Sequence, residues 1–261
     1  MRKADLPAAG SNPDGTQAVR RAASILRRLG RGGMQGVSLG DITQALQLPR
    51  STTHRILKCL VEEGLVRHDT ERRRYFAGQL TYELGLTVTQ SALQVAKWRV
   101  AVDRIAARTG VTAYLLSRSG IEATCVLKTD GNAVIRVIPV EVGQRRFLGI
   151  GAGATALLAA LDEETRERII GTIEPHLSSY STLTTDKVRE VVEETRKAGY
   201  SVSRGNVAKD VVGIGIVVPD DDGEPSLALS IAGLASQIDD KGVDAWVQVI
   251  RSEINAVLAT D

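Results

Sequence analysis

The sequence predicts an α+β protein in two parts, a small and mostly helical head followed by a larger body built on an antiparallel sheet. Its 261 residues suffice for two modest domains that each bury a core. Apolar residues recur at helical spacing up to about residue 64, whereas the later part runs through strands, helices, strands and a final helix, an order typical of the α+β class. The predicted parts are an arm over residues 1–15, the head over 16–79, a linker helix over 80–93 and the body over 94–261.

Charge is distributed unevenly between these parts. Residues 16–79 hold twelve Lys and Arg against five Asp and Glu, whereas residues 80–261 hold nineteen against twenty-four. A basic module ahead of an acidic one is the electrostatic pattern of a DNA-binding head on a regulatory body. Solvated surface charge of mixed sign gives such a split by accident in some proteins, so charge alone does not decide the function.

Cysteine usage and hydropathy bear on the compartment. Cys59 and Cys125 are the two cysteines, which gives neither a disulfide framework nor a paired-cysteine metal motif. No apolar run approaches the roughly 18 residues that cross a bilayer, and no secretory leader is recognisable. We therefore expect a cytoplasmic protein with no membrane contact, no metal and no cofactor. Aromatic residues are scarce, at 3%, which weakens any proposal of a stacking surface for single-stranded nucleic acid.

Three helices are predicted in the head, after an arm rich in Pro, Gly, Ser, Asn and Asp that we expect to be disordered. The first helix lies in "TQAVRRAASILRRLGRGG" and stops at its closing glycines. Ser38 opens a short second helix, with Asp41 three residues on as the acid of a capping box. Pro49 suits the first turn of a third helix, which runs to about Glu63 and ends at a glycine.

The third helix has two distinct faces. On a helical wheel the apolar face carries Thr53, Ile56, Leu57 and Leu60, and the opposite face carries Ser51, His54, Arg55 and Lys58. A short helix, a tight turn and a longer helix with a cationic outer face form the helix-turn-helix arrangement, whose second helix enters the major groove of DNA. The candidate DNA-binding residues of this helix are Arg50, Ser51, Thr52, Thr53, His54, Arg55 and Lys58.

A basic hairpin follows the third helix. Two β-prone runs, Leu65–His68 and Arg73–Ala77, flank a polar turn over residues 69–72. A hairpin in this position is a wing, so the head is predicted to be a winged helix-turn-helix. Its candidate contacts to phosphates or to the adjacent minor groove are Arg72, Arg73 and Arg74.

A catalytic interpretation of the third helix lacks the partners that it needs. Ser51 and His54 are close enough to suggest a nucleophile and its base. A serine nucleophile needs a buried base that a third group orients, yet no carboxylate lies in helical register and His54 falls on the solvent face. We therefore assign no catalytic residue.

Five segments resemble one family of bacterial transcription factors, the isocitrate lyase regulator (IclR) type. They are "AVRRAASILRRL", "VSLGDITQALQLPRSTTHRILKCLVEEGLV", "RRRYFAGQLTYELG", "GAGATALLAAL" and "SLALSIAGLASQI", in the family's order and spacing over roughly residues 16–258. The resemblance implies a winged helix-turn-helix, a linker helix and a C-terminal effector-binding domain related to GAF and PAS sensors. It also implies binding to a double-stranded DNA operator as a homodimer or a dimer of dimers.

The body's pattern agrees with this resemblance. Residues 79–110 have helical spacing in two pieces, and strands are predicted in "VTAYLLSRSG", "IEATCVLKTDG" and "AVIRVIPVEVG". Helices are expected from Ala152 to about Gly199. Two strands in "VVGIGIVVPDDDG" and "PSLALSIAG" and a final helix over Lys241–Ala259 complete an antiparallel-sheet domain.

The resemblance places an effector site between the sheet and the helix that opens at "LGIGAGAT". Free backbone amides at a helix N-terminus suit a small carboxylate, so a small organic acid is the expected effector. The positions carried over are Leu148, Ala152, Gly153, Gly213, Gly215 and Ser230. The chain departs from the family's pattern at "FLGIGAGA", Ala232 and "SRGNVAKD", changes that favour an aromatic or otherwise more apolar acid.

Other motifs have ordinary explanations. The glycines of "GIGAGAT" lack the context of a dinucleotide loop, "PDDDGEP" lacks the spacing of a calcium loop, and His176 stands alone and is expected in solvent. The sequence thus predicts a DNA-binding transcriptional regulator modulated by an organic acid, and it leaves open whether the output is repression or activation. The alternatives are a metabolite-binding enzyme with an ancillary DNA-binding domain, for which the body's polar residues offer little, and an architectural DNA binder, which needs no sensor.

Overall fold

The computed structural model describes residues 16–133, 140–180, 183–219, 225–238 and 240–259. The predicted arm and most of the predicted strand "AVIRVIPVEVG" lie outside these residues. The chain divides into two compact units, Met1–Gln90 and Ser91–Asp261, which are described separately. In the described residues no helix is both long and apolar enough to cross a membrane.

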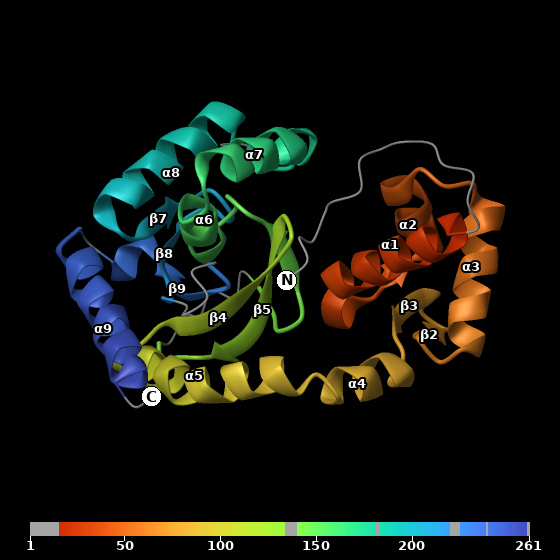
Figure 1. The fold of residues 1–261 in the computed structure, drawn as a ribbon, viewed down its shortest axis with the longest axis horizontal. Helices are drawn as coiled ribbons and strands as arrows, with labels where there is room; N and C mark the ends of the chain where they lie inside the picture. Colours follow the sequence, from red (N-terminus) through yellow and green to blue (C-terminus); the bar gives the residue numbers. More distant parts are fainter. Residues whose placement is uncertain (1–15, 134–139, 181–182, 220–224, 239, 260–261) are drawn as a thin grey trace. The chain divides into compact units, whose positions relative to one another are not determined.

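The first unit is a helical bundle with a small antiparallel sheet, whose described strands run in the order β1-β3-β2. Its elements are α1 (Gln17–Gly32), a 3-10 turn (Gly33–Gln35), β1 (Val37–Ser38), α2 (Leu39–Leu46), α3 (Arg50–Glu62), β2 (Val66–Asp69), β3 (Arg74–Ala77) and α4 (Gln79–Leu86), as labelled in Figure 1. The three predicted helices and the hairpin are confirmed; β1 is too short to leave a pattern in the sequence.

Local chemistry accounts for the helix boundaries of this unit. The Ser38 hydroxyl accepts the Asp41 amide at 3.1 Å, and the Asp41 carboxylate accepts the Ser38 amide at 3.3 Å, which confirms the capping box. Pro49 is the N-cap of α3 and so stands one residue before the first helical position. The core between the helices and the sheet consists of Ile25, Leu29, Val37, Ile42, Leu57, Leu60, Val66 and Tyr75.

Helix α4 is attached to the end of α3 through glycine. The amide of Leu80 donates to the Gly64 carbonyl at 3.1 Å, and the Thr81 hydroxyl donates to the Leu65 carbonyl at 2.8 Å. A side chain on Gly78 would overlap the Gly64 carbonyl, so only glycine permits this approach. The linker helix predicted over residues 80–93 consists of α4, a turn and the first residues of α5 (Thr89–Thr109).

The second unit is built on an antiparallel sheet, whose described strands run in the order β6-β5-β4-β9-β8-β7. The strands are β4 (Thr112–Ser119), β5 (Glu122–Thr129), β6 (Arg145–Phe147), β7 (Ser201–Arg204), β8 (Val211–Val217) and β9 (Leu227–Leu234). Four of them were predicted. In "AVIRVIPVEVG" the described residues 140–143 form a turn rather than a strand, and the pairing with β5 falls later, in β6.

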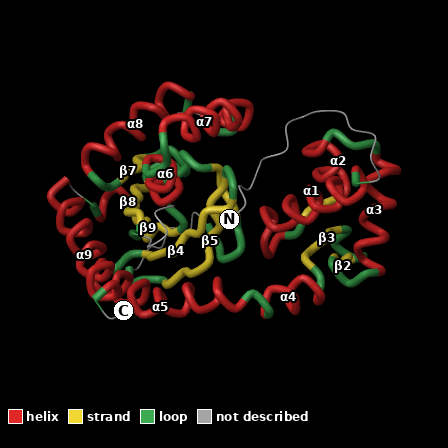
Figure 2. The backbone as a smooth tube through the Cα atoms, in the orientation of Figure 1, coloured by secondary structure: helices red, strands yellow, loops and turns green. Residues whose placement is uncertain are grey.

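Helices cover both faces of this sheet (Figure 2). One layer is α5 with α9 (Asp240–Leu258), and the other is α6 (Ala152–Ala159) beneath α7 (Glu163–Leu177) and α8 (Thr185–Ala198). Strand alternation divides β9 between them, since Leu229 and Ile231 face α5 and α9 whereas Ala228 faces α6. The predicted helical stretch between residues 152 and 199 is confirmed and consists of α6, α7 and α8, and the final helix is confirmed as well.

Candidate functional site

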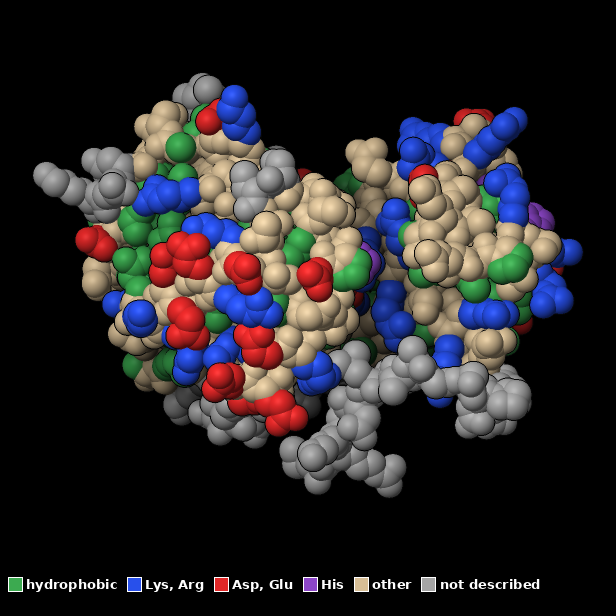
Figure 3. Space-filling model, turned by 90° about the horizontal axis from the view of Figure 1, so that it is seen from above, with side chains coloured by type: hydrophobic (Ala, Val, Ile, Leu, Met, Phe, Trp, Pro, Cys, Tyr) green, Lys and Arg blue, Asp and Glu red, His purple; other side chains and the backbone are tan. Residues whose placement is uncertain are grey.

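The outer face of α3 presents most of the predicted DNA-binding side chains. Its exposed residues are Arg50, Ser51, His54, Arg55 and Lys58, with Thr52 half-buried among them. Lys58 lies 3.8 Å from Glu62 in an exposed pair that contributes little to stability. Lys and Arg side chains gather over this unit with few acidic ones between them (Figure 3).

Thr53 departs from the prediction. Its side chain is 0% exposed, and its hydroxyl donates to the Pro49 carbonyl at 3.2 Å. It is therefore buried inside the unit, as is Leu57, in agreement with its place on the apolar side of the wheel. We remove Thr53 from the candidate DNA contacts.

The three arginines of the wing have different environments. Arg72 and Arg73 are exposed at the hairpin turn, where Arg73 adopts a left-handed conformation with φ of 52°. Asp69 accepts the Arg72 amide at 2.9 Å, a hydrogen bond that, with the charges of Arg72 and Arg67, lowers the pKa of Asp69. Arg74 is half-buried and donates to the Gly36 carbonyl at 3.0 Å. Its guanidinium fixes the wing to the loop before β1, so Arg74 is a positioning residue rather than a simple phosphate contact.

A groove runs between α3 and the wing. It is lined by Leu39, Arg50, Ser51, His54, His68, Thr70, Arg73 and Tyr75, with no Asp or Glu among the described residues. His68 stacks on Tyr75 with ring centroids 4.2 Å apart, as directly opposed residues of β2 and β3. Sequence reasoning missed His68, Thr70 and Tyr75, although cross-strand pairing in the hairpin could have indicated the first and last.

The second unit contains a cavity between the sheet and the N-terminus of α6. About 60 Å³ is open to the centres of water molecules, several times the roughly 10–15 Å³ that one water needs. Its described lining is Tyr114, Leu116, Ala123, Val140, Arg146, Ile150, Gly151, Ala152, Gly153, Ala154, Ser203, Val207, Val211, Gly213, Ser230, Ile231 and Ala232.

Four of the six predicted effector residues line this cavity, namely Ala152, Gly153, Gly213 and Ser230. Leu148 does not; it is 0% exposed and packs with α6, α7 and α8. Gly215 does not either, because a side chain on it would overlap the backbone of Ala152, which shows that β8 and α6 touch there. Both residues belong to the packing behind the cavity and do not form its wall.

Arg146 is the main residue that sequence reasoning missed. It is the only charged side chain among the described lining residues. Its Nη1 atom lies 3.5 Å from the point where a side chain on Gly151 would begin, which places the guanidinium at the N-terminal end of α6. Burial lowers the pKa of Arg146, because the charged form loses water contact. An arginine and helix amides together form a positively charged end to a cavity whose other described lining side chains are uncharged and mostly apolar.

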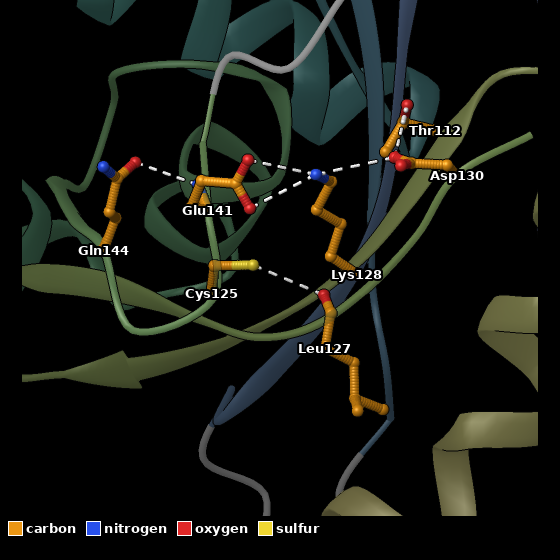
Figure 4. Close-up of polar contacts among 7 residues, drawn as sticks. All are labelled: Thr112, Cys125, Leu127, Lys128, Asp130, Glu141 and Gln144. Carbon is orange, nitrogen blue, oxygen red and sulfur yellow. Dashed lines mark hydrogen bonds and ion pairs between the residues drawn. The ribbon is translucent and has the colours of Figure 1, made fainter. Parts of the chain in front are cut away.

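A polar cluster beside β5 holds the part of the following loop over residues 140–144 (Figure 4). The Lys128 ammonium contacts Glu141 at 3.1 Å and Asp130 at 3.5 Å, and Gln144 accepts the Glu141 amide at 2.9 Å. The Cys125 thiol donates to the Leu127 carbonyl at 3.3 Å, and burial raises the pKa of this thiol to about 12, so it is not a nucleophile at neutral pH. The loop thus carries Val140 to the cavity wall and leads directly into β6 and Arg146.

Among the described residues, no three His, Cys, Asp or Glu side chains come together in a way that could hold a metal ion. His176 is exposed, as predicted, and stacks on Phe147 with ring centroids 4.5 Å apart.

A winged helix-turn-helix with a basic outer face, in one chain with a small-molecule cavity, defines a ligand-responsive DNA-binding regulator. Residues 18–70 match the IclR helix-turn-helix domain, and residues 87–257 match the family described as bacterial transcriptional regulator IclR, C-terminal. The chain belongs to the IclR family of transcriptional regulators. The enzyme alternative is therefore set aside, because this family regulates transcription.

Individual relatives are similar over most of their length. The transcriptional repressor IclR of Escherichia coli K12 is 28% identical over 227 residues, which cover 85% of this chain and 82% of the repressor. An IclR transcriptional regulator from Alicyclobacillus acidocaldarius has a solved structure with a TM-score of 0.70 and 25% identity, covering 93% of this chain and 97% of that one.

A third relative was solved with an acid bound. It is an IclR homolog from Microbacterium hydrocarbonoxydans in complex with 4-hydroxybenzoate, with a TM-score of 0.69 and 19% identity, covering 94% of this chain and all of that one. At this identity the likeness establishes the shared fold.

Proposed function

We propose that this protein is a transcriptional repressor that binds an operator as a dimer in the cytoplasm and releases or tightens its hold when a small organic acid enters the cavity beside α6. The observation that carries the proposal is the cavity itself, with Arg146 and the first amides of α6 at one end. Repression is inferred from the curated relatives, which include the repressor IclR of Escherichia coli.

DNA contact is divided between two elements of the first unit. Ser51, His54 and Arg55 are exposed at the N-terminal half of α3, from which a recognition helix reaches base edges. Arg72 and Arg73 project from the wing turn, where cations meet phosphates. His68 and Thr70 line the groove between these two elements, and we add them to the proposed DNA-binding residues.

Dimerisation is proposed through an apolar patch on and after α4. Its side chains are Tyr82, Leu84, Leu86 and Val88, which are 63%, 52%, 64% and 51% exposed. Four large apolar side chains exposed on so short a segment are more than isolated surface residues account for, and such patches mark interaction sites. Two copies joined there would address the two half-sites of a pseudo-palindromic operator.

Regulation requires that the acid favour one arrangement of the protein over another. A ligand shifts such an equilibrium only by its difference in affinity for the two arrangements, typically about 1–3 kcal/mol of coupling. Because coupling is reciprocal, operator DNA must change the affinity for the acid by the same factor.

Footprinting on the DNA upstream of the protein's own gene tests this function, with and without a panel of organic acids. We expect a protected site with two related halves and protection that changes with at least one acid. Protection that is absent from this region and from the rest of a genomic fragment library would refute operator binding. Protection that no acid alters, together with no acid bound, would refute the sensor role.

A further inference from the structure

We propose that the cavity beside α6 selects a small monocarboxylic acid with an apolar body, branched or aromatic, and that Arg146 holds its carboxylate. This inference rests on the effector role proposed above and names the chemical class of the effector. The departures of the sequence from its family favour an apolar acid, and the cavity now supplies a residue and a geometry for the recognition.

Charge decides that the ligand is an anion. Arg146 brings the only formal charge among the described lining residues, and it lies at the N-terminal end of α6, where backbone N–H groups carry partial positive charge. A guanidinium offers its N–H donors in a fork that matches a carboxylate.

The uncharged lining of the cavity decides that the anion has one charge. Its described side chains are mostly aliphatic, and its polar groups other than Arg146 are the hydroxyls of Tyr114, Ser203 and Ser230. A second carboxylate on the ligand would lose its water against these side chains with no cation to compensate. Burial raises the pKa of the Tyr114 phenol far above its usual range, so Tyr114 stays neutral and leaves the charge of the site at one.

The same lining decides that the body of the ligand is apolar. Contact with aliphatic side chains favours a ligand that removes apolar surface from water, at about 25 cal/mol per Å². Gly153 keeps this space open, because a side chain there would overlap Leu116 and approach Ser230. A two-carbon polar acid would fill the charged end and leave the apolar walls in water.

Calorimetric titration of the full-length protein with five probes tests the class. The probes are benzoate and 3-methylbutanoate as apolar monocarboxylates, benzamide as the uncharged counterpart of benzoate, glyoxylate as a small polar acid and malonate as a dianion. We expect the two apolar acids to bind, and benzamide, glyoxylate and malonate each to bind about tenfold more weakly or worse. Benzamide binding as tightly as benzoate, tighter binding of glyoxylate or malonate, or no binding by any probe at millimolar concentration overturns the proposal.

Variants assign the carboxylate contact to one residue. Arg146→Gln should weaken benzoate about tenfold or more while leaving benzamide unchanged, and Arg146→Lys, which keeps the charge but not the fork, should restore part of the loss. The matched control is Arg118→Gln, which removes the same charge from β4 outside the cavity lining and should leave both ligands unaffected. Equal losses of benzoate and benzamide in a folded Arg146→Gln protein would show packing damage and overturn the role of Arg146.

A parallel measurement of operator affinity separates this proposal from the sensor role. If benzoate binds through Arg146 and operator affinity stays constant, the ligand class stands and the sensor role fails. If glyoxylate binds more tightly than benzoate and shifts operator affinity, the sensor role stands and the ligand class fails.

Discussion

Arg55 and Arg73 are both exposed arginines of the first unit, yet they lie on elements with different tasks. Arg55 projects from α3 and Arg73 from the wing turn. Arg55→Ala should cost about 1–3 kcal/mol of specific binding through loss of a bidentate base contact, whereas Arg73→Ala should weaken binding to all sequences and lower the salt dependence. Gel-shift titrations on operator and random DNA at several salt concentrations measure both. Equal losses on the two DNAs for Arg55→Ala would contradict base reading.

Ser230 offers the corresponding test in the second unit, because it lines the cavity on β9 and its hydroxyl donates to the Ile214 carbonyl at 2.9 Å. Ser230→Leu should fill the cavity and abolish the response to an acid while the first unit still binds DNA. Footprinting with and without the acid measures this. The control is Ser119→Leu, an exposed position at the end of β4. A full response retained in the Ser230 variant would place the effector elsewhere.

Single residues also show how far a sequence determines a site. Gly153, Gly213 and Ser230 could be placed at the cavity from the family resemblance, whereas Gly215 was placed there wrongly and Arg146 was missed. Arg145 and Arg146 are adjacent in β6, so strand alternation points them to opposite faces: Arg145 pairs with buried Glu122 at 3.2 Å, and Arg146 lines the cavity. Which face carries the cavity depends on how the sheet packs against α6, and that information is absent from the local sequence.

At the scale of elements, α6 and β8 pack closely together in the second unit. Ser201 donates its hydroxyl to the Ala152 carbonyl, and Gly215 lies beneath the same turn. Gly215→Ala should lower the free energy of unfolding by about 1–3 kcal/mol through overpacking. Gly171→Ala is the matched control, because α7 leaves open space at Gly171 and alanine there should stabilise by about 0.5–1 kcal/mol. Urea denaturation measures both free energies of unfolding. An unchanged value for Gly215→Ala would show that α6 can move away from β8 to make room for the methyl group.

The patch on α4 gives a second prediction at this scale. Leu84→Glu places a charge among exposed apolar side chains and should convert dimers to monomers, lowering operator affinity about 10²-fold or more by loss of two-site binding. Sedimentation and gel-shift titration measure the two effects. Glu83→Gln alters the neighbouring exposed position and should change neither. A wild-type monomer at micromolar concentration with full operator affinity would contradict the patch as an interface.

Elements were predictable from sequence where they carry their own signals. The capping box at Ser38, the wheel of α3 and the long apolar runs of β4, β8 and β9 identified these elements directly. Strands β1 and β6 have only two and three residues, too few to show alternation, and β7 has four with no turn signal that pairs it with a neighbour. Their strand geometry comes from pairing with β3, β5 and β8. Tertiary pairing, rather than local propensity, determines such short strands.

For the molecule as a whole, the charge asymmetry predicted from composition corresponds to the division of labour between the two units. The basic unit exposes its cations on α3 and the wing, while the acidic unit keeps Arg146 inside its cavity. One cation in an apolar site recognises a ligand, whereas many on an open face neutralise phosphates. The sequence revealed the total charge of each unit, but not which arginines face DNA and which one lines the effector cavity.

The close packing of α6 on β8 has a consequence for engineering. The amides that meet the ligand's charge belong to Gly151, Ala152 and Gly153, whose side chains are absent or minimal, and they are held in place by Ser201 and Gly215. The walls that meet the ligand's body, Leu116, Val207 and Val211, come from other segments. A library of variants at these three residues alone would therefore change which acid a cellular biosensor detects. Every variant would keep the α6 amides that bind the carboxylate.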